Sequence, residues 1–281
     1  MQNRSREGLS FMKYIIPFLL FFSLSLFSAS SGPCGEVLSD NGMHQGECID
    51  ITSDHTDKAS LQRGAKLYIN YCLGCHSLKH ARYNRVAKDL GIPEQIFKDN
   101  LILGDQKLGD LINIGMSTQD AKDWFGVAPP DLTLEVGLRG EDWVYTYLKS
   151  FYIDESRPLG VNNAVYKNVG MPNVLVSLQG NQVETCRKIP FFAENGGLKQ
   201  DQLSGKVLTK KKCGFLEVTD PGILSVEEFD LAMMDLTNFL SYMTDPIREE
   251  RKSLGVYVIL YLLVFSIFGY LLYREFKKDL H

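Results

Sequence analysis

The sequence of 281 residues lacks low-complexity segments and internal repeats, so one or two ordinary globular domains are expected rather than a repeat array. It also lacks an excess of basic charge, because 30 Lys and Arg residues stand against 34 Asp and Glu residues. The resulting net charge of −4 argues against a nucleic-acid ligand and suits a basic protein partner. Cysteine is scarce as well. Apart from one close pair, the six cysteines are scattered singly, which excludes a zinc site built from two such pairs.

The close pair lies in the stretch Cys72-Leu73-Gly74-Cys75-His76. Two thiols three positions apart, followed at once by a histidine, are the attachment pattern of haem c. Each thiol adds to one vinyl group of the porphyrin, and the histidine then binds the iron as an axial ligand. Half of a zinc site and a thioredoxin-like redox pair are the alternatives. The first lacks its second pair of ligands and the second gains nothing from His76, so we predict one haem c attached to Cys72 and Cys75.

Residues 1–30 have the features of a secretory signal. An apolar run, Tyr14 to Phe27, follows three basic residues and precedes several small ones. The run is shorter than the ~20 residues of a spanning helix, so we expect cleavage after Ser30, with a retained anchor as the alternative. Export predicts an oxidising compartment, in which the other four cysteines form disulfides. Of the three possible pairings we favour the sequence-local one, Cys34–Cys48 and Cys186–Cys213, over free buried thiols.

Three further positions are candidates for contacts with the haem. The stretch Ala128-Pro129-Pro130-Asp131-Leu132 is rigid, and a carbonyl such as that of Pro130 is a candidate acceptor for the free ring nitrogen of His76. An ordinary loop turn is the alternative. Met171 lies between Gly170 and Pro172 with no helical or strand pattern, so it is the best candidate for the sixth ligand, with Met116 as its rival. Arg139 is a candidate partner of a haem propionate, although a lone arginine is more often a surface residue.

Periodicity predicts the remaining elements. A helix from Asp57 delivers the haem motif, and residues 77–90 are expected to form a mostly solvated helix. Residues 174–222 are uneven and polar and are expected to be an irregular excursion held by a disulfide. A capped helix begins at Ser225 and ends at Asp245-Pro246. Residues 254–273 carry no charge and are long enough, at ~1.5 Å per residue, to cross a bilayer once.

These features, in this order, resemble the cytochrome c1 family, the haem subunits of quinol–cytochrome c oxidoreductase (bc1) complexes, most closely its proteobacterial members. The resemblance runs from about Thr56 to the C-terminus. It rests on the haem motif with the stretch before it and on five further features: 82–85, 128–132, 140–143, 170–172 and the C-terminal span. One departure is that 91–109 is short and mixed, whereas some members carry a strongly acidic insertion there.

The resemblance implies a mainly α-helical cytochrome c fold. Residues 31–247 would form the periplasmic domain, 254–273 the single span of a bacterial inner (cytoplasmic) membrane, and 274–281 a cytoplasmic tail. Cys72 and Cys75 would hold the haem, with His76 and Met171 as axial ligands and Arg139 near a propionate.

The resemblance also implies an electron carrier that is not an enzyme by itself. It would lie beside cytochrome b and pass electrons from the Rieske iron–sulfur protein to a soluble or membrane-bound cytochrome c. A stand-alone membrane-anchored cytochrome and a haem sensor with an open sixth position are the alternatives.

Overall fold

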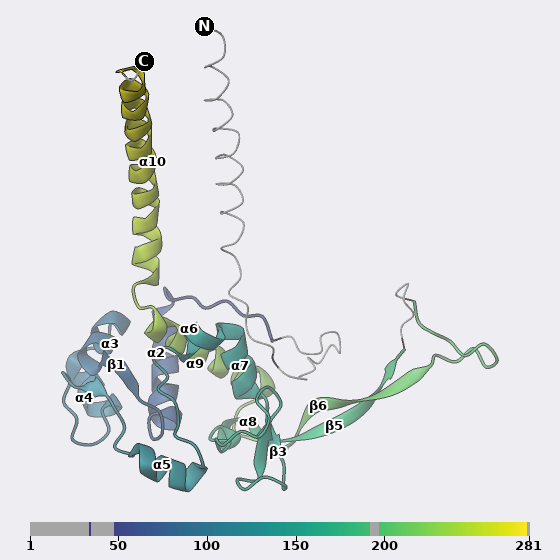
Figure 1. Cartoon of the computed structure of the whole chain (residues 1–281). Helices are drawn as coiled ribbons and strands as arrows, with labels where there is room; N and C mark the ends of the chain where they lie inside the picture. Colours follow the sequence, from purple (N-terminus) through teal and green to yellow (C-terminus); the bar gives the residue numbers. More distant parts are fainter. Residues whose placement is uncertain (1–33, 35–47, 192–196, 280–281) are drawn as a thin grey trace.

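The computed structural model describes residues 34, 48–191 and 197–279, and the expected signal segment 1–30 lies outside this part of the chain. Figure 1 shows a mainly helical body from which one long helix rises and one two-stranded ribbon projects. The helical elements are α2 Lys58–Leu67, the π-helix η1 Tyr68–Cys72, α3 Tyr83–Leu90, α4 Glu94–Leu101, α5 Thr118–Phe125, α6 Glu135–Arg139, α7 Glu141–Lys149, α8 Val176–Gln179, α9 Val226–Thr244 and α10 Arg248–Asp279. The strands are β1 Leu78–Arg82, β2 Leu111–Ile112, β3 Phe151–Ile153, β4 Val161–Asn163, β5 Gly180–Pro190 and β6 Thr209–Pro221. They form antiparallel pairs β1–β2, β3–β4 and β5–β6.

The core is organised around the crossing of α2 and α9. The predicted apolar face of α2 is buried, and Asp57 caps the helix by accepting from the backbone N–H of Ser60. Gly64 makes the crossing close, because a Cβ atom there would lie 2.1 Å from the carbonyl oxygen of Asp235 on α9. Helix α9 begins with the predicted capping box of Ser225 and Glu228. Both helical predictions are therefore confirmed.

The prediction of a solvated helix over 77–90 is wrong in its first half and in its exposure. Leu78–Arg82 pairs with β2, and only Tyr83–Leu90 is helical. Four residues of this helix are buried: Tyr83, Val86, Ala87 and Leu90. The charged residues of α3 obscured its apolar face in the sequence. Strand β1 has only five residues, which is too short to be recognised from an alternating pattern.

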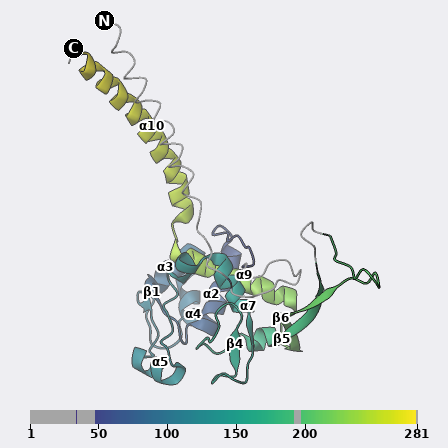
Figure 2. The same cartoon turned by 45° about the vertical axis from the view of Figure 1, so that its right-hand side comes forward.

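Residues 180–190 and 209–221 form two regular strands, which corrects the expectation of an irregular excursion over 174–222; the described residues between them form turns and an isolated bridge. Strands β5 and β6 pair from Gly180 with Pro221 to Pro190 with Thr209 and form a long antiparallel ribbon. It projects away from the helical body, as Figures 1 and 2 both show. A disulfide joins Cys186 to Cys213 across the ribbon, and a second one joins Cys34 to Cys48. The sequence-local pairing is thus confirmed.

The predicted C-terminal span lies within α10. This helix is long and apolar enough to cross a membrane, and none of its most apolar window is buried against the rest of the chain. Its first residue, Arg248, is bound to the haem-motif domain by contacts with Glu141 and Ser53. The helix therefore has an exposed apolar length that could cross a membrane, and its first turn is packed against the domain.

Candidate haem site

The haem motif follows directly from a widened helical turn. Helix α2 passes into η1, in which the N–H of Leu73 donates to the carbonyl of Tyr68 five residues earlier. The next turn closes through the N–H groups of Cys75 and His76, which both donate to the carbonyl of Cys72. Single π-turns inside helices are frequent at functional sites because they re-aim side chains. Here the π-turn ends at Cys72, and the turn after it carries Cys75 and His76.

His76 is oriented by the rigid proline stretch. Its Nδ1 lies 2.7 Å from the carbonyl oxygen of Pro130, the contact proposed from the sequence. The backbone around it is paired as well, because the N–H of Leu132 donates to the carbonyl of Ser77 at 3.0 Å. With Nδ1 as the donor to Pro130, Nε2 is the nitrogen left for a metal. Burial lowers the pKa of His76, which keeps the ring neutral and able to act as a ligand.

One cavity of about 390 Å³ gathers all six candidate residues, since Cys72, Cys75, His76, Pro130, Arg139 and Met171 line it. Most of the rest of its wall is apolar or aromatic. The wall is drawn from η1, the proline stretch, α6, α7, the loop before α8, and α9. Segments as far apart in sequence as Cys72 and Leu240 therefore meet at this one site.

Met171 stands in an extended loop on this cavity, as its Gly/Pro surroundings suggested. Gly170 lets the loop lie close to the chain after α5, because a Cβ atom there would lie 2.8 Å from Cγ1 of Val127. The hydroxyl of Tyr147 on α7 points at the sulfur of Met171, with an oxygen–sulfur distance of 3.4 Å. This contact was not predicted from the sequence, because Tyr147 and Met171 lie 24 residues apart.

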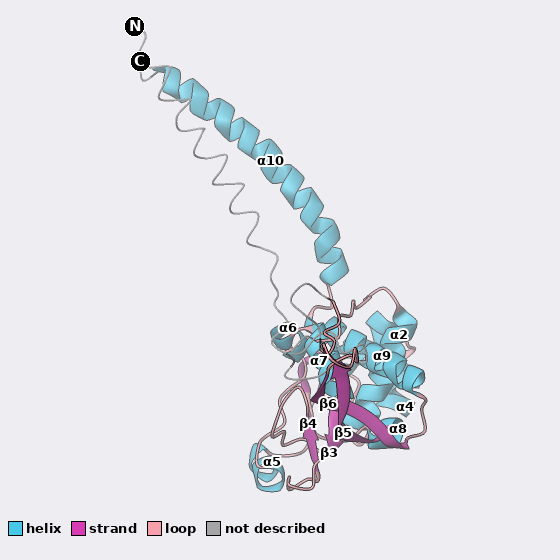
Figure 3. Cartoon of the chain, turned by 90° about the vertical axis from the view of Figure 1, so that its right-hand side faces the viewer, coloured by secondary structure: helices cyan, strands magenta, loops and turns pink. Residues whose placement is uncertain are grey.

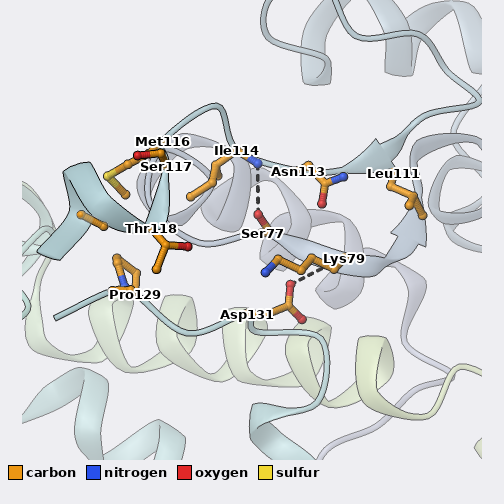
Figure 4. Close-up of a pocket in the computed structure, with 12 residues that line it drawn as sticks. Ser77, Lys79, Leu111, Asn113, Ile114, Met116, Ser117, Thr118, Pro129 and Asp131 are labelled. Atoms are coloured by element: carbon orange, nitrogen blue, oxygen red, sulfur yellow. Dashed lines mark hydrogen bonds between the residues drawn. The ribbon is translucent and has the colours of Figure 1, made fainter.

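Met116 does not line this cavity. It lines a neighbouring cavity of about 540 Å³, shown in Figure 4, at the start of α5 beside Ser117 and Thr118. The two cavities share only Ala128 and Pro129 of the proline stretch. The placement therefore favours Met171 over Met116 as the partner of His76.

Arg139 lies at the wall of the cavity with part of its charge already balanced. Its Nε donates to Glu135 at 2.8 Å, and its guanidinium lies over the Trp143 ring at 4.4 Å. Trp143 in turn stacks on Tyr147, with ring centroids 5.0 Å apart. A guanidinium has five N–H donors, so Arg139 retains donors for an anionic group entering the cavity.

A further contact that the sequence did not reveal holds the end of the motif. The hydroxyl of Tyr68 donates to the carbonyl oxygen of His76 at 2.5 Å. Tyr68 is almost wholly buried, and burial raises the pKa of its hydroxyl, so it acts as a neutral donor. The only available signal was the position of Tyr68 on the buried face of the helix that leads into the haem motif, where it is the first residue of η1.

The donor set fits a covalently attached haem. Neither Cys72 nor Cys75 is in a disulfide. Burial raises the pKa of the Cys72 thiol to about 12, which disfavours the thiolate that a redox pair needs. The described residues also hold no cluster of three or more His, Cys, Asp or Glu that would bind another metal. An apolar cavity with two free thiols, a neutral imidazole and a thioether matches haem c.

Comparisons with known proteins agree with this site. The sequence model described as the Cytochrome C1 family matches residues 49–185 and 220–280. Cytochrome c1 of Allochromatium vinosum is 49% identical over 249 residues, which are 89% of this chain and 95% of that relative. A Nitrosomonas europaea protein named ammonia monooxygenase gamma subunit is 40% identical over 228 residues, covering 81% of this chain and 86% of that relative. Cytochrome b/c1 of Bradyrhizobium diazoefficiens is 23% identical over 257 residues, covering 80% of this chain and 34% of that relative.

The family match breaks off at residue 185 and resumes at 220, so it omits the part of the ribbon beyond Thr185 and keeps every candidate haem residue. The main hydrophobic cluster around α2 and α9, the cavity and α10 all lie within the matched ranges. A match over more than half of the residues, together with 49% identity across nearly the whole of one relative, shows that the chain belongs to the cytochrome c1 family.

Proposed function

We propose that the chain is the haem electron-transfer subunit of a quinol–cytochrome c oxidoreductase. One observation carries this proposal: His76 and Met171, which are 95 positions apart, line the same cavity as the two free thiols of the haem motif. The haem would be held by Cys72 and Cys75 and ligated by His76 and Met171. When bound, the haem supplies one-electron redox chemistry, and a thioether opposite an imidazole favours its reduced state.

The protein supplies orientation and an apolar lining. Pro130 fixes the donor nitrogen of His76, and Tyr147 directs a hydroxyl at Met171. The stacked rings of Trp143 and Tyr147 contribute aromatic surface to the wall of the cavity. Such a fixed, apolar site limits rearrangement when the charge of the centre changes, which suits an electron carrier.

The names of the relatives suggest two functions, an electron carrier and a subunit of an oxygenase, and the proposed iron ligands distinguish between them. If His76 and Met171 both ligated the iron, no coordination position would be left for oxygen, so this ligand set would favour an electron carrier over an oxygenase subunit. The same argument disfavours a haem sensor, which needs an open sixth position. By itself the chain would therefore be a carrier and not an enzyme.

Within the complex, we propose that the chain lies beside cytochrome b, takes electrons from the Rieske iron–sulfur protein and passes them to a soluble or membrane-bound cytochrome c. The haem domain would lie in the periplasm and α10 in the inner membrane. Membership of the cytochrome c1 family supports this placement, and α10 supports attachment to a membrane.

The test is purification in mild detergent with identification of the bound subunits. Cytochrome b and an iron–sulfur protein should copurify with the chain, and quinol should reduce its haem in that preparation. Isolation of the chain alone, with its haem reducible only by an unrelated donor, would point to a stand-alone cytochrome. Rapid CO binding without displacement of a methionine ligand would instead point to a sensor.

A further inference from the structure

The outer part of the β5–β6 ribbon is an exposed arm that the rest of the fold does not use. Among its described residues from Cys186 to Cys213, none is buried, and all but Ile189, Asp201 and Lys212 are classed as exposed. It also coincides with the gap in the family match, 186–219. An isolated two-stranded ribbon is marginally stable in water, so the Cys186–Cys213 disulfide at the start of the arm serves to keep it ordered.

The arm is strongly basic on an acidic protein. Between the two cysteines the sequence has seven Lys or Arg residues and two Asp or Glu residues, in a chain of net charge −4. Arg187 is balanced by Glu217 at 2.7 Å, whereas no other described residue forms an ion pair with the lysines of the arm. Lys199 and Lys210 both lie over the ring of Phe191, at 5.2 and 5.5 Å from its centroid. The arm thus combines ammonium groups with an exposed aromatic ring.

The turn at Asp201–Lys206 presents an apolar side chain. The carboxylate of Asp201 accepts from the backbone N–H groups of Leu203 and Ser204, so its charge is used inside the turn. Leu203 stands at this turn with its whole side chain exposed, and Leu198 nearby is half exposed. A single exposed leucine needs no explanation. A fully exposed leucine at the turn of a disulfide-linked ribbon that also carries several lysines, however, has the composition of a membrane-interface segment.

The direction of the arm agrees with this composition. In Figure 1 the ribbon projects mainly sideways from the domain, and in Figures 1, 2 and 3 its tip lies higher than its base, toward the end of the domain from which α10 leaves. If α10 anchors the chain in a bilayer, the arm stays close to the bilayer surface. The effective concentration of that surface at the arm is then high, so even weak contacts between them are populated. Anionic lipids attract basic segments by about 1 kcal/mol for each Lys or Arg near the surface.

We propose that this arm docks on the anionic surface of the bilayer that α10 spans, with the lysines on lipid phosphates and Leu203 in the interface. The docking would hold the haem domain in a fixed orientation over the membrane. An acidic protein partner would satisfy the lysines but leaves Leu203 unexplained. This inference rests on α10 crossing a bilayer and not on the identity of the electron donor or acceptor.

The experiment uses the full-length haem protein in nanodiscs. A nitroxide is attached to Leu203→Cys, the haem is kept reduced, and collision of the label with oxygen and with a water-soluble nickel chelate is measured by EPR. In discs of phosphatidylcholine with phosphatidylglycerol the label should gain oxygen contact and lose nickel contact. In discs of phosphatidylcholine alone it should remain open to nickel, and high salt should abolish the difference.

A matched pair of variants separates lipid contact from net charge. Replacing Lys210, Lys211 and Lys212 by glutamine should lower the ratio of docked to free label by on the order of a hundredfold. Replacing the exposed Lys66, Lys88 and Lys98 by glutamine makes the same charge change elsewhere and should leave the ratio unchanged. Equal nickel contact in both kinds of disc would overturn the proposal. A second contrary result is that the label loses nickel contact when more copies of the protein are placed in each disc, or when an acidic protein is added, and not when the lipid charge is changed. That result would overturn the proposal and assign the arm to a protein partner.

Discussion

The Nδ1 atom of His76 lies 2.7 Å from the carbonyl oxygen of Pro130, 54 residues further along the chain. This contact depends on Asp131, whose carboxylate accepts from the N–H of Lys79 at 2.7 Å and from the N–H of Thr133 at 3.0 Å. A carbonyl that accepts from the second ring nitrogen makes the imidazole a stronger donor to a metal. If His76 ligates the haem iron, Asp131 would therefore act on the iron without touching it.

We expect Asp131→Ala to raise the redox potential by about 30 mV, roughly a threefold change in the electron-transfer equilibrium. The loop loosens, His76 donates less strongly, and the oxidised state loses stabilisation. Asp131→Asn is the control, because it removes the same charge but keeps an oxygen acceptor. Redox titration of both variants measures the difference. Equal potentials would show that charge alone is responsible.

Replacing Met171 by leucine should keep the side-chain volume and remove the sulfur ligand. Haem should stay attached through Cys72 and Cys75, while the potential falls by at least ~59 mV, a tenfold change for one electron. The absorption band of methionine bound to oxidised iron should disappear. Met116→Leu, in the neighbouring cavity, should change neither property. If the first variant keeps the band and the second loses it, the ligand assignment is wrong.

Gly64→Ala tests the helix crossing at the core. The new Cβ atom would lie 2.1 Å from the carbonyl oxygen of Asp235 and 2.6 Å from Cβ of Phe239, so α2 and α9 must separate. We expect a loss of about 1–3 kcal/mol in the free energy of unfolding, although alanine is the better helix former. Gly115→Ala, which meets no atom within 4 Å, is the control. Urea unfolding of both variants checks this, and equal stability would contradict the close crossing.

Glu141 should make the stability depend on acid pH. Burial by itself would raise its pKa, but hydrogen bonds from Ser241 and Ser53 and the charge of Arg248 together hold the pKa below its ordinary value of 4.5. Because the folded-state pKa is the lower one, the stabilisation is present above pH 4.5 and is lost as the pH falls through the folded value. We expect about 1 kcal/mol, since the carboxylate is only partly buried.

Urea unfolding at a series of pH values measures this contribution. Glu141→Gln should lower the stability at neutral pH and flatten its decline in acid. The exposed Glu155, replaced by glutamine, should leave the curve unchanged. A Glu141→Gln curve parallel to that of the unmodified protein would show that this carboxylate does not carry the acid dependence.

Truncation tests whether α10 is only an anchor. A chain ending at Lys252 should be soluble and keep its haem, because the site and α9 all precede this point. A chain ending at Ile247 also loses Arg248, which contacts Glu141 at 3.0 Å and Ser53 at 3.1 Å, and should be less stable by about 1 kcal/mol. Thermal unfolding of the two products gives the comparison. An insoluble or haem-free product from the longer chain would mean that the span is part of the fold.

Much of the site could be predicted because its chemistry is local in sequence. The spacing of Cys72, Cys75 and His76 is a covalent requirement of haem c, so five adjacent residues suffice to recognise it. The capping box at Ser225 and the long apolar helix were equally visible, since both depend on neighbours within one or two turns. The disulfides followed because both pairs close short loops.

Only the tertiary structure decided the contacts between distant segments. Met171 and Met116 both follow a glycine, and they are distinguished only by the cavity that each one lines. The hydroxyls of Tyr68 and Tyr147 found partners that no periodicity encodes. Strand β1 and the β5–β6 ribbon were missed because strand pairing is non-local and a short alternation resembles a helix face. The sequence by itself thus determined the position of the haem-attachment motif, because that motif is five adjacent residues; the packing of distant loops and helices decided what surrounds it.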